Sequence, residues 1–269
     1  MLKKAVFPLI FLILSANPSF SQEETPEYLF EKGVSLVNSG QYPEAILVFN
    51  TYLDTIQDNF QAYYNRGVAN FNTRLYDSAL ADMNKTIELR DDFADAYFLR
   101  GLIHKQKKNR NNALVDFNKV IKFDPENAEA YNNRGMLYTE VQQYPNALLD
   151  FSKAIKYNPD YADAYFNRGY TYIQTDDYTN AIASFNKAIP LDTNFTLAYV
   201  NRGLAYYAIQ SYEKSIEDLE RAVQMESSYS SQLDKYIKSS KELLEQKKKE
   251  MDKKRKEKEK EDKEKEKDK

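Results

Sequence analysis

The sequence predicts an all-α fold, a solenoid of six tandem helix-turn-helix repeats, and three observations support this prediction. Apolar residues recur with helical spacing along residues 26–229. Glycine and proline, which interrupt helices, are scarce at 7 and 8 of 269 residues, whereas charged residues make up 29% of the chain. Six of the seven glycines recur every 34 residues, at Gly33, Gly67, Gly101, Gly135, Gly169 and Gly203.

Each repeat begins seven residues before its glycine. The repeats are therefore 26–59, 60–93, 94–127, 128–161, 162–195 and 196–229. The recurring residues at positions 4, 8 and 11, and then at 17, 20, 21, 24 and 28, have helical spacing. They predict a first helix over about positions 2–14 and a second over about positions 16–29. Glycine at position 8 and alanine at position 20 (serine in the last repeat) leave room for the two backbones to approach.

This pattern resembles the tetratricopeptide repeat (TPR) family over residues 26–229. The features that carry the resemblance are the period, the small residues at positions 8 and 20, the aromatic residue at position 24, and Pro125 and Pro159 at position 32. The resemblance implies a right-handed superhelical solenoid whose first helices line a concave groove, where protein partners usually bind.

The first 21 residues read as a signal peptide. Lys3 and Lys4 give a basic start, an apolar run follows over 5–16, and small and polar residues lead to Ser21. The apolar run is too short to span a bilayer, which needs roughly 20 residues. We therefore expect cleavage before Gln22, a lead-in at 22–25, and a secreted or periplasmic protein with no stable membrane insertion. An uncleaved anchor and a buried helix are the alternatives for this segment.

The sequence after the last repeat changes character twice. In residues 230–246, Leu233, Tyr236 and Ile237 begin an apolar stripe at helical spacing, which predicts a helix that caps the end of the stack. Residues 247–269 hold 13 Lys or Arg and 9 Asp or Glu. Such a segment cannot bury a core, so we expect a solubilising tail, partly helical or disordered. Contact with an anionic surface is the alternative.

The resemblance selects candidate binding residues on the first helices. At position 6, side-chain amides that both donate and accept resemble the asparagine ladder with which some TPR proteins hold a peptide backbone: Asn65, Asn133, Asn167 and Asn201. Positions 5 and 9 supply an aromatic concave surface, with Tyr64, Phe98, Phe166 and Tyr170. Position 2 supplies an acidic rim, with Asp95 and Asp163.

Each of these three sets has a structural alternative. Leu99 interrupts the ladder, and asparagines there could instead satisfy polar groups between repeats. The aromatic residues could pack between first helices. Acids in the first turn are favoured by the helix dipole alone.

Five repeats carry an arginine immediately before the glycine, at Arg66, Arg100, Arg134, Arg168 and Arg202. Four of the same repeats carry an aspartate at position 23, at Asp82, Asp116, Asp150 and Asp218. We expect ion pairs that join the two helices of a repeat.

The remaining composition argues against several kinds of site and several classes of function. The chain has no cysteine and one histidine, His104, so thiolate and multi-histidine metal sites and a cysteine nucleophile are excluded. The excess of acids before residue 247 disfavours nucleic acid. No phosphate loop or nucleophile motif appears, so we expect no cofactor and no enzyme activity. A scaffold that binds a protein or peptide is the leading hypothesis; a self-associating adaptor or spacer is the alternative.

Overall fold

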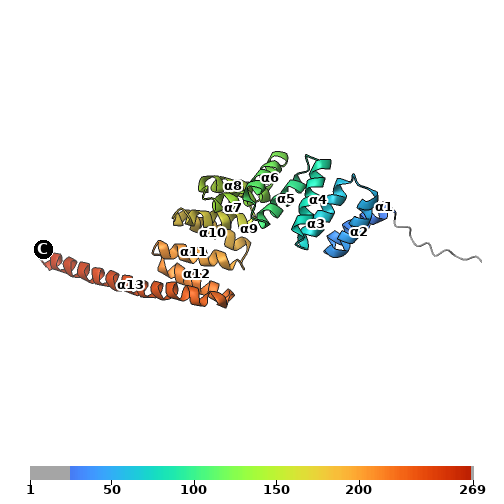
Figure 1. Cartoon of the computed structure of the whole chain (residues 1–269). Helices are drawn as coiled ribbons and strands as arrows, with labels where there is room; N and C mark the ends of the chain where they lie inside the picture. Colours follow the sequence, from blue (N-terminus) through green and yellow to red (C-terminus); the bar gives the residue numbers. More distant parts are fainter. Residues whose placement is uncertain (1–24, 268–269) are drawn as a thin grey trace, which may run out of the picture. The chain divides into compact units, whose positions relative to one another are not determined.

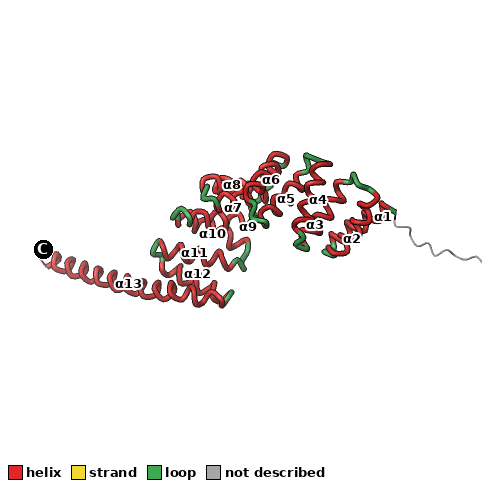
Figure 2. The backbone as a smooth tube through the Cα atoms, viewed as in Figure 1, coloured by secondary structure: helices red, strands yellow, loops and turns green. Residues whose placement is uncertain are grey.

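The structure is a computed structural model that describes residues 25–267. Within this range the chain forms thirteen α-helices and one short 3₁₀-helix, without a strand (Figures 1 and 2). The all-α prediction is confirmed. The predicted signal peptide, residues 1–21, lies outside the described residues.

Twelve of the helices form six pairs that follow the repeats. The first helices are α1 (Pro26–Asn38), α3 (Phe60–Asn72), α5 (Ala94–Gln106), α7 (Ala128–Glu140), α9 (Ala162–Ile173) and α11 (Thr196–Ala208). The second helices are α2 (Tyr42–Thr55), α4 (Tyr76–Leu89), α6 (Arg110–Phe123), α8 (Tyr144–Tyr157), α10 (Tyr178–Leu191) and α12 (Tyr212–Met225). The chain divides into two compact units, one ending at Leu89 and the other beginning at Arg90.

Local backbone chemistry sets the helix ends one residue away from those predicted. First helices begin at position 1 because the residue before it can act as an N-cap; the Asn127 side chain, for example, accepts the Ala130 N–H at 2.8 Å. Second helices begin at position 17 because the turn needs a left-handed residue at position 15. Gly40 takes this conformation with φ 75°, and five non-glycine residues take it with φ between 56° and 62°: Arg74, Lys108, Gln142, Asp176 and Gln210.

The repeated glycine lies against the residue at position 24. A Cβ added to Gly135 would lie 2.8 Å from Cε1 of Phe151, and one added to Gly169 would lie 2.7 Å from the same atom of Phe185. Both phenylalanines are fully buried. The absent side chain at position 8 therefore lets an aromatic ring fill the space between the two helices of a repeat.

Replacing Gly135 with alanine should lower the free energy of unfolding by about 1–3 kcal/mol, because the rigid Phe151 ring must move. Urea unfolding followed by circular dichroism measures the change. Gly67→Ala is the matched control: its added methyl group meets the flexible end of Met83, so its loss should be smaller. Equal stability of wild type and Gly135→Ala would contradict this account of the packing.

Arginine–aspartate pairs join the two helices of four repeats, as the sequence predicted. The shortest distance is 2.6 Å in the pair Arg66–Asp82 and 2.7 Å in the pairs Arg100–Asp116, Arg134–Asp150 and Arg202–Asp218. Three of these arginines also donate to an asparagine on the preceding second helix, at Asn50, Asn118 and Asn186. The arginine thus connects three helices across a repeat boundary.

The C-terminal helix α13 (Ser230–Lys267) covers the last repeat and then continues. Leu233 and Ile237 are buried against Leu219 and Ala222 of α12, in the position predicted for a capping helix. The charged segment after residue 246 adopts the helical form of the two that the sequence left open, because one helix runs through it to Lys267. Ion pairs between neighbouring turns, such as Lys249–Glu245 at 3.5 Å and Arg255–Glu259 at 3.8 Å, support it there.

Candidate functional site

The first helices of the last three repeats form the concave side of the second unit. Helices α7, α9 and α11 approach one another in sequence, whereas the main contacts of α8 and α10 are with first helices. A surface of closely spaced helices backed by more widely spaced ones curves toward the closer set. Side chains of α7, α9 and α11 therefore face a shared groove.

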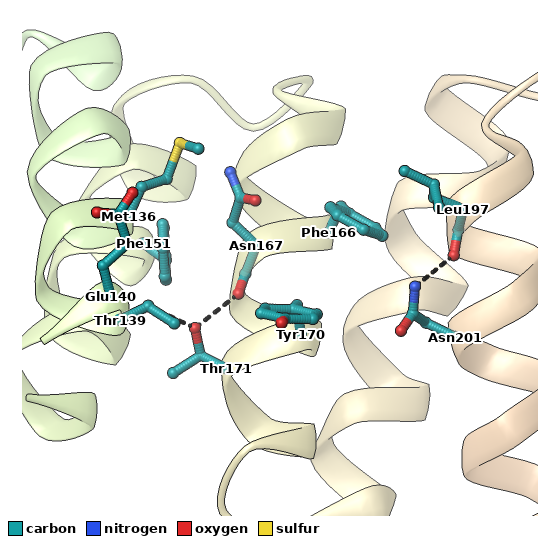
Figure 3. Close-up of a pocket in the computed structure, with 10 residues that line it drawn as sticks. All are labelled: Met136, Thr139, Glu140, Phe151, Phe166, Asn167, Tyr170, Thr171, Leu197 and Asn201. Atoms are coloured by element: carbon teal, nitrogen blue, oxygen red, sulfur yellow. Dashed lines mark hydrogen bonds between the residues drawn. The ribbon is translucent and has the colours of Figure 1, made fainter. Parts of the chain in front are cut away.

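A hollow of about 320 Å³ lies in this groove (Figure 3). Its lining residues are Met136, Thr139, Glu140, Phe151, Phe166, Asn167, Tyr170, Thr171, Leu197 and Asn201. Ten side chains from four helices thus converge on one place, and most of them are apolar or uncharged.

The lining contains one aromatic ring that is packed against other rings and two apolar side chains that are exposed. Phe166 packs on Phe195 with ring centroids 4.6 Å apart, and on Phe185 at 5.8 Å. Tyr170 and Leu197, by contrast, remain 42% and 43% exposed at the mouth. Exposed apolar groups beside a fixed wall are typical of an interaction site.

Threonine hydroxyl groups connect the helices α7 and α9 that form the wall of the hollow. Thr139 on α7 and Thr171 on α9 are hydrogen-bonded at 2.9 Å, and Thr171 also donates to the backbone carbonyl of Asn167 at 2.8 Å. These bonds fix the spacing of α7 and α9 below the hollow, where dashed lines mark them in Figure 3.

Asn167 belongs to a polar chain that joins two repeats. Its amide donates to Oδ1 of Asn132 at 3.0 Å, and the Asn132 amide donates to the Tyr161 hydroxyl at 3.2 Å. Burial raises the pKa of Tyr161 to about 12, so this hydroxyl stays protonated at neutral pH. Asn132 stands at a position that is aromatic in four other repeats, and it orients Asn167 toward the groove wall.

The other predicted asparagines bond mainly to their own helix. Asn65, Asn133 and Asn201 each donate to the carbonyl four residues earlier, at 2.8–2.9 Å. Asn133 also accepts from Nζ of Lys105 on α5 at 2.8 Å, and burial lowers the pKa of that lysine. In Asn201, the second amide hydrogen and Oδ1 have no partner among the described residues, so they can receive a ligand.

The structure gathers four of the ten predicted residues at the hollow: Phe166, Asn167, Tyr170 and Asn201. Phe98 on α5 packs edge-on against Phe117, and Asp95 and Asp163 are exposed in the first turns of α5 and α9. Asn133 lies outside the hollow, and Tyr64 and Asn65 lie on α3 of the first unit. The ladder residues therefore do not have equivalent surroundings.

Sequence reasoning did not select several lining residues. Thr139 and Glu140 stand at positions 12 and 13, on the groove side of a first helix, so their register was a usable signal. Thr171 stands at position 10 and bonds across to α7, which no single-repeat pattern indicates.

Phe166→Ala should lower the free energy of unfolding by about 2–4 kcal/mol, because it removes two ring contacts. Tyr170→Ala should change it by less than about 1 kcal/mol, because that side chain is substantially exposed. Thermal and urea unfolding of both variants compare them. A large loss in Tyr170→Ala would mean that this ring is part of the core and not free to bind.

The described residues offer neither a metal-binding cluster nor a helix that could span a membrane. No group of three or more His, Asp or Glu side chains in residues 25–267 is arranged to hold a metal ion. Over the same range, no helix combines the length and the apolar character needed to cross a membrane.

Comparison with known proteins gives consistent matches. Family profiles described as TPR or tetratricopeptide repeats match residues 30–92, 94–127, 117–148, 135–176, 169–210 and 197–229. No curated protein matches the sequence.

Several solved structures share the fold. The C-terminal part of a TPR repeat-containing protein from Cytophaga hutchinsonii has a TM-score of 0.65 at 19% identity, covering 78% of this chain and 84% of its own. MamA from Desulfovibrio magneticus RS-1 has a TM-score of 0.59 at 20% identity, covering 63% and 96%. YrrB, described as a TPR protein with an unusual peptide-binding site, has a TM-score of 0.57 at 22% identity, covering 66% and 92%.

Proposed function

The chain belongs to the tetratricopeptide repeat family, and from this premise we propose that it is a non-catalytic scaffold outside the cytoplasm that binds a protein or peptide segment in the groove of α7, α9 and α11. The observation that carries the proposal is the hollow between these helices, with Tyr170 and Leu197 exposed at its mouth. The description of YrrB as a peptide-binding TPR protein supports the same use of the fold.

The chemistry of the hollow suits one apolar side chain of an extended segment. Phe166 and Met136 offer apolar walls, and Tyr170 and Leu197 can close over an inserted group. Asn201 offers a free amide hydrogen and oxygen to the backbone beside it, so an unpaired peptide group need not be buried. Glu140, 43% exposed and already paired with Arg110 at 2.7 Å, adds little net charge.

A photo-activated cross-linking residue in place of Leu197 should capture a partner polypeptide in the native host, because this side chain stands at the mouth of the hollow. Mass spectrometry of the cross-linked product identifies the captured segment. The same residue in place of Gln224, which is exposed on α12, is the matched control and should not capture that segment.

Two results would contradict the groove proposal. Identical products from both positions would show that capture does not depend on the groove. A product made only of this chain would favour the alternative, a self-associating adaptor or spacer. The triple variant Asn133→Ala, Asn167→Ala, Asn201→Ala separates the ladder from the apolar contacts, since it leaves the aromatic lining unchanged.

The location outside the cytoplasm rests on the basic, apolar and polar parts of residues 1–21. Cell fractionation and N-terminal sequencing of the mature protein test it, and the expected first residue is Gln22. An intact Met1 on protein recovered from the cytoplasm would contradict export. Replacing Leu9 and Leu12 with arginine should block processing, because a charged central segment is a poor signal.

A further inference from the structure

The second helices α6, α8 and α10 have an unusual distribution of charge on a chain whose net charge is −3. They contain two acids, Asp116 and Asp150, and both are buried in pairs with arginine. The outward positions carry lysines instead, at Lys119, Lys122, Lys153, Lys156 and Lys187. The neighbouring helix α12 has four acids in its fourteen residues, so this basic character is local to α6, α8 and α10.

Exposed apolar side chains share a helix face with four of these lysines. Val115 is 56% and Leu149 is 60% exposed, although both lie within regular helices. Each precedes a lysine by four and by seven residues, a spacing that places the apolar and charged groups on one helix face. We call this surface of α6, α8 and α10 the outer face. None of its five lysines forms an ion pair with a described residue; Lys122 and Lys156 lie over the rings of Phe123 and Tyr157, at 5.6 and 5.2 Å. No described carboxylate therefore neutralises the charge of these lysines.

Arg168 is the exception among the repeated arginines. Arg134 donates to both oxygens of Asp150 at 2.7 Å and to Asn118 at 2.6 Å. At the two equivalent partner positions, sixteen residues on either side of Arg168, stand Ser184 and Ser152. Arg168 donates from Nε to Ser184 at 3.2 Å, and within the described part of the chain Nη1 and Nη2 have no hydrogen-bond partner.

The environment of Arg168 favours a carboxylate as its missing partner. A guanidinium presents parallel N–H groups that match the two oxygens of a carboxylate, and the sister arginines bind aspartate in this way. Arg168 is half-buried, and its register places it between α8 and α10, whose outward lysines are Lys153 and Lys187. A single projecting side chain would reach Arg168 from between these two helices, whereas a flat charged surface would meet the lysines first.

We propose that the outer face is a second docking surface, which binds an acidic protein segment that also carries apolar side chains. One carboxylate of the segment binds Arg168 as Asp150 binds Arg134, the lysines neutralise its other acids, and its apolar groups cover Leu149 and Val115. This surface lies on second helices and is independent of the groove on the first helices.

The test is selection from a displayed library of random 12-residue peptides on the wild-type protein and on Ser184→Asp. The variant supplies Arg168 with the carboxylate that four sister repeats have, so it should fold at least as stably as the wild type. Peptides rich in Asp or Glu together with Leu, Ile, Val or Phe should be recovered on the wild type and fall at least tenfold on Ser184→Asp. Gln224→Glu, which makes the same charge change on α12, should retain them.

The variant Leu149→Ser tests the apolar part of the outer face without changing its charge. It should also reduce recovery of the same peptides. Peptides that bind the groove should survive in all of these variants and be lost in Tyr170→Ala, which separates the two surfaces.

Three outcomes would overturn the proposal. The first is equal recovery of acidic peptides on wild type and Ser184→Asp, or no enrichment of acids at all. The second is flotation with vesicles containing phosphatidylglycerol that Ser184→Asp abolishes while no peptide is selected, which would assign the face to lipid. The third is wild-type self-association in sedimentation that Ser184→Asp abolishes, again without peptide selection, which would assign it to a second copy.

Discussion

The contact between a glycine on one helix and a bulky side chain on its partner is the constraint on which the rest of this structure depends. Where the ring of Phe151 lies against Gly135, no side chain fits between them, and the two helices are held close. Repetition of this contact every 34 residues gives each pair of helices nearly the same geometry. Helix pairs of one shape can then stack in a regular series, and contacts between repeats, such as Thr139 with Thr171, set the spacing of the first helices that line the groove.

That constraint also explains why the fold could be predicted from the sequence whereas much of the site could not. The glycine register and the Arg–Asp pairs are contacts within one repeat, so they recur visibly in the sequence. The hollow depends on contacts between repeats that occur once, such as Thr139 with Thr171 and Asn132 with Asn167. The left-handed residues at position 15 are mostly not glycine, so residue type did not indicate them. The charged end of α13 lacks an apolar stripe, so its helix depends on local ion pairs and could not be separated from disorder by pattern alone.

The second unit presents two different surfaces built from one repeated plan. On the concave side, apolar groups converge and the uncharged amides of Asn167 and Asn201 lie beside them. On the outer face, lysines and isolated aliphatic groups alternate. Most residues of both surfaces stand at positions outside the repeated contact between glycine and the residue at position 24. Single substitutions in the repeat pattern, such as Ser184 where four other repeats have aspartate, therefore give individual repeats different surface chemistry.

Helix α13 continues well beyond the residues that contact the last repeat. Lys248 pairs with Glu213 of α12 at 3.9 Å, and beyond it the ion pairs join residues of α13 to one another. With a rise of about 1.5 Å per residue, the part from 247 to 267 extends roughly 30 Å past the cap. Removing seven residues would shorten this arm by about 10 Å and turn its far end by only about 20°, since seven residues are close to two full turns. A change of length by whole groups of seven residues would therefore move the end of α13 along the helix axis and leave the direction of its side chains nearly unchanged.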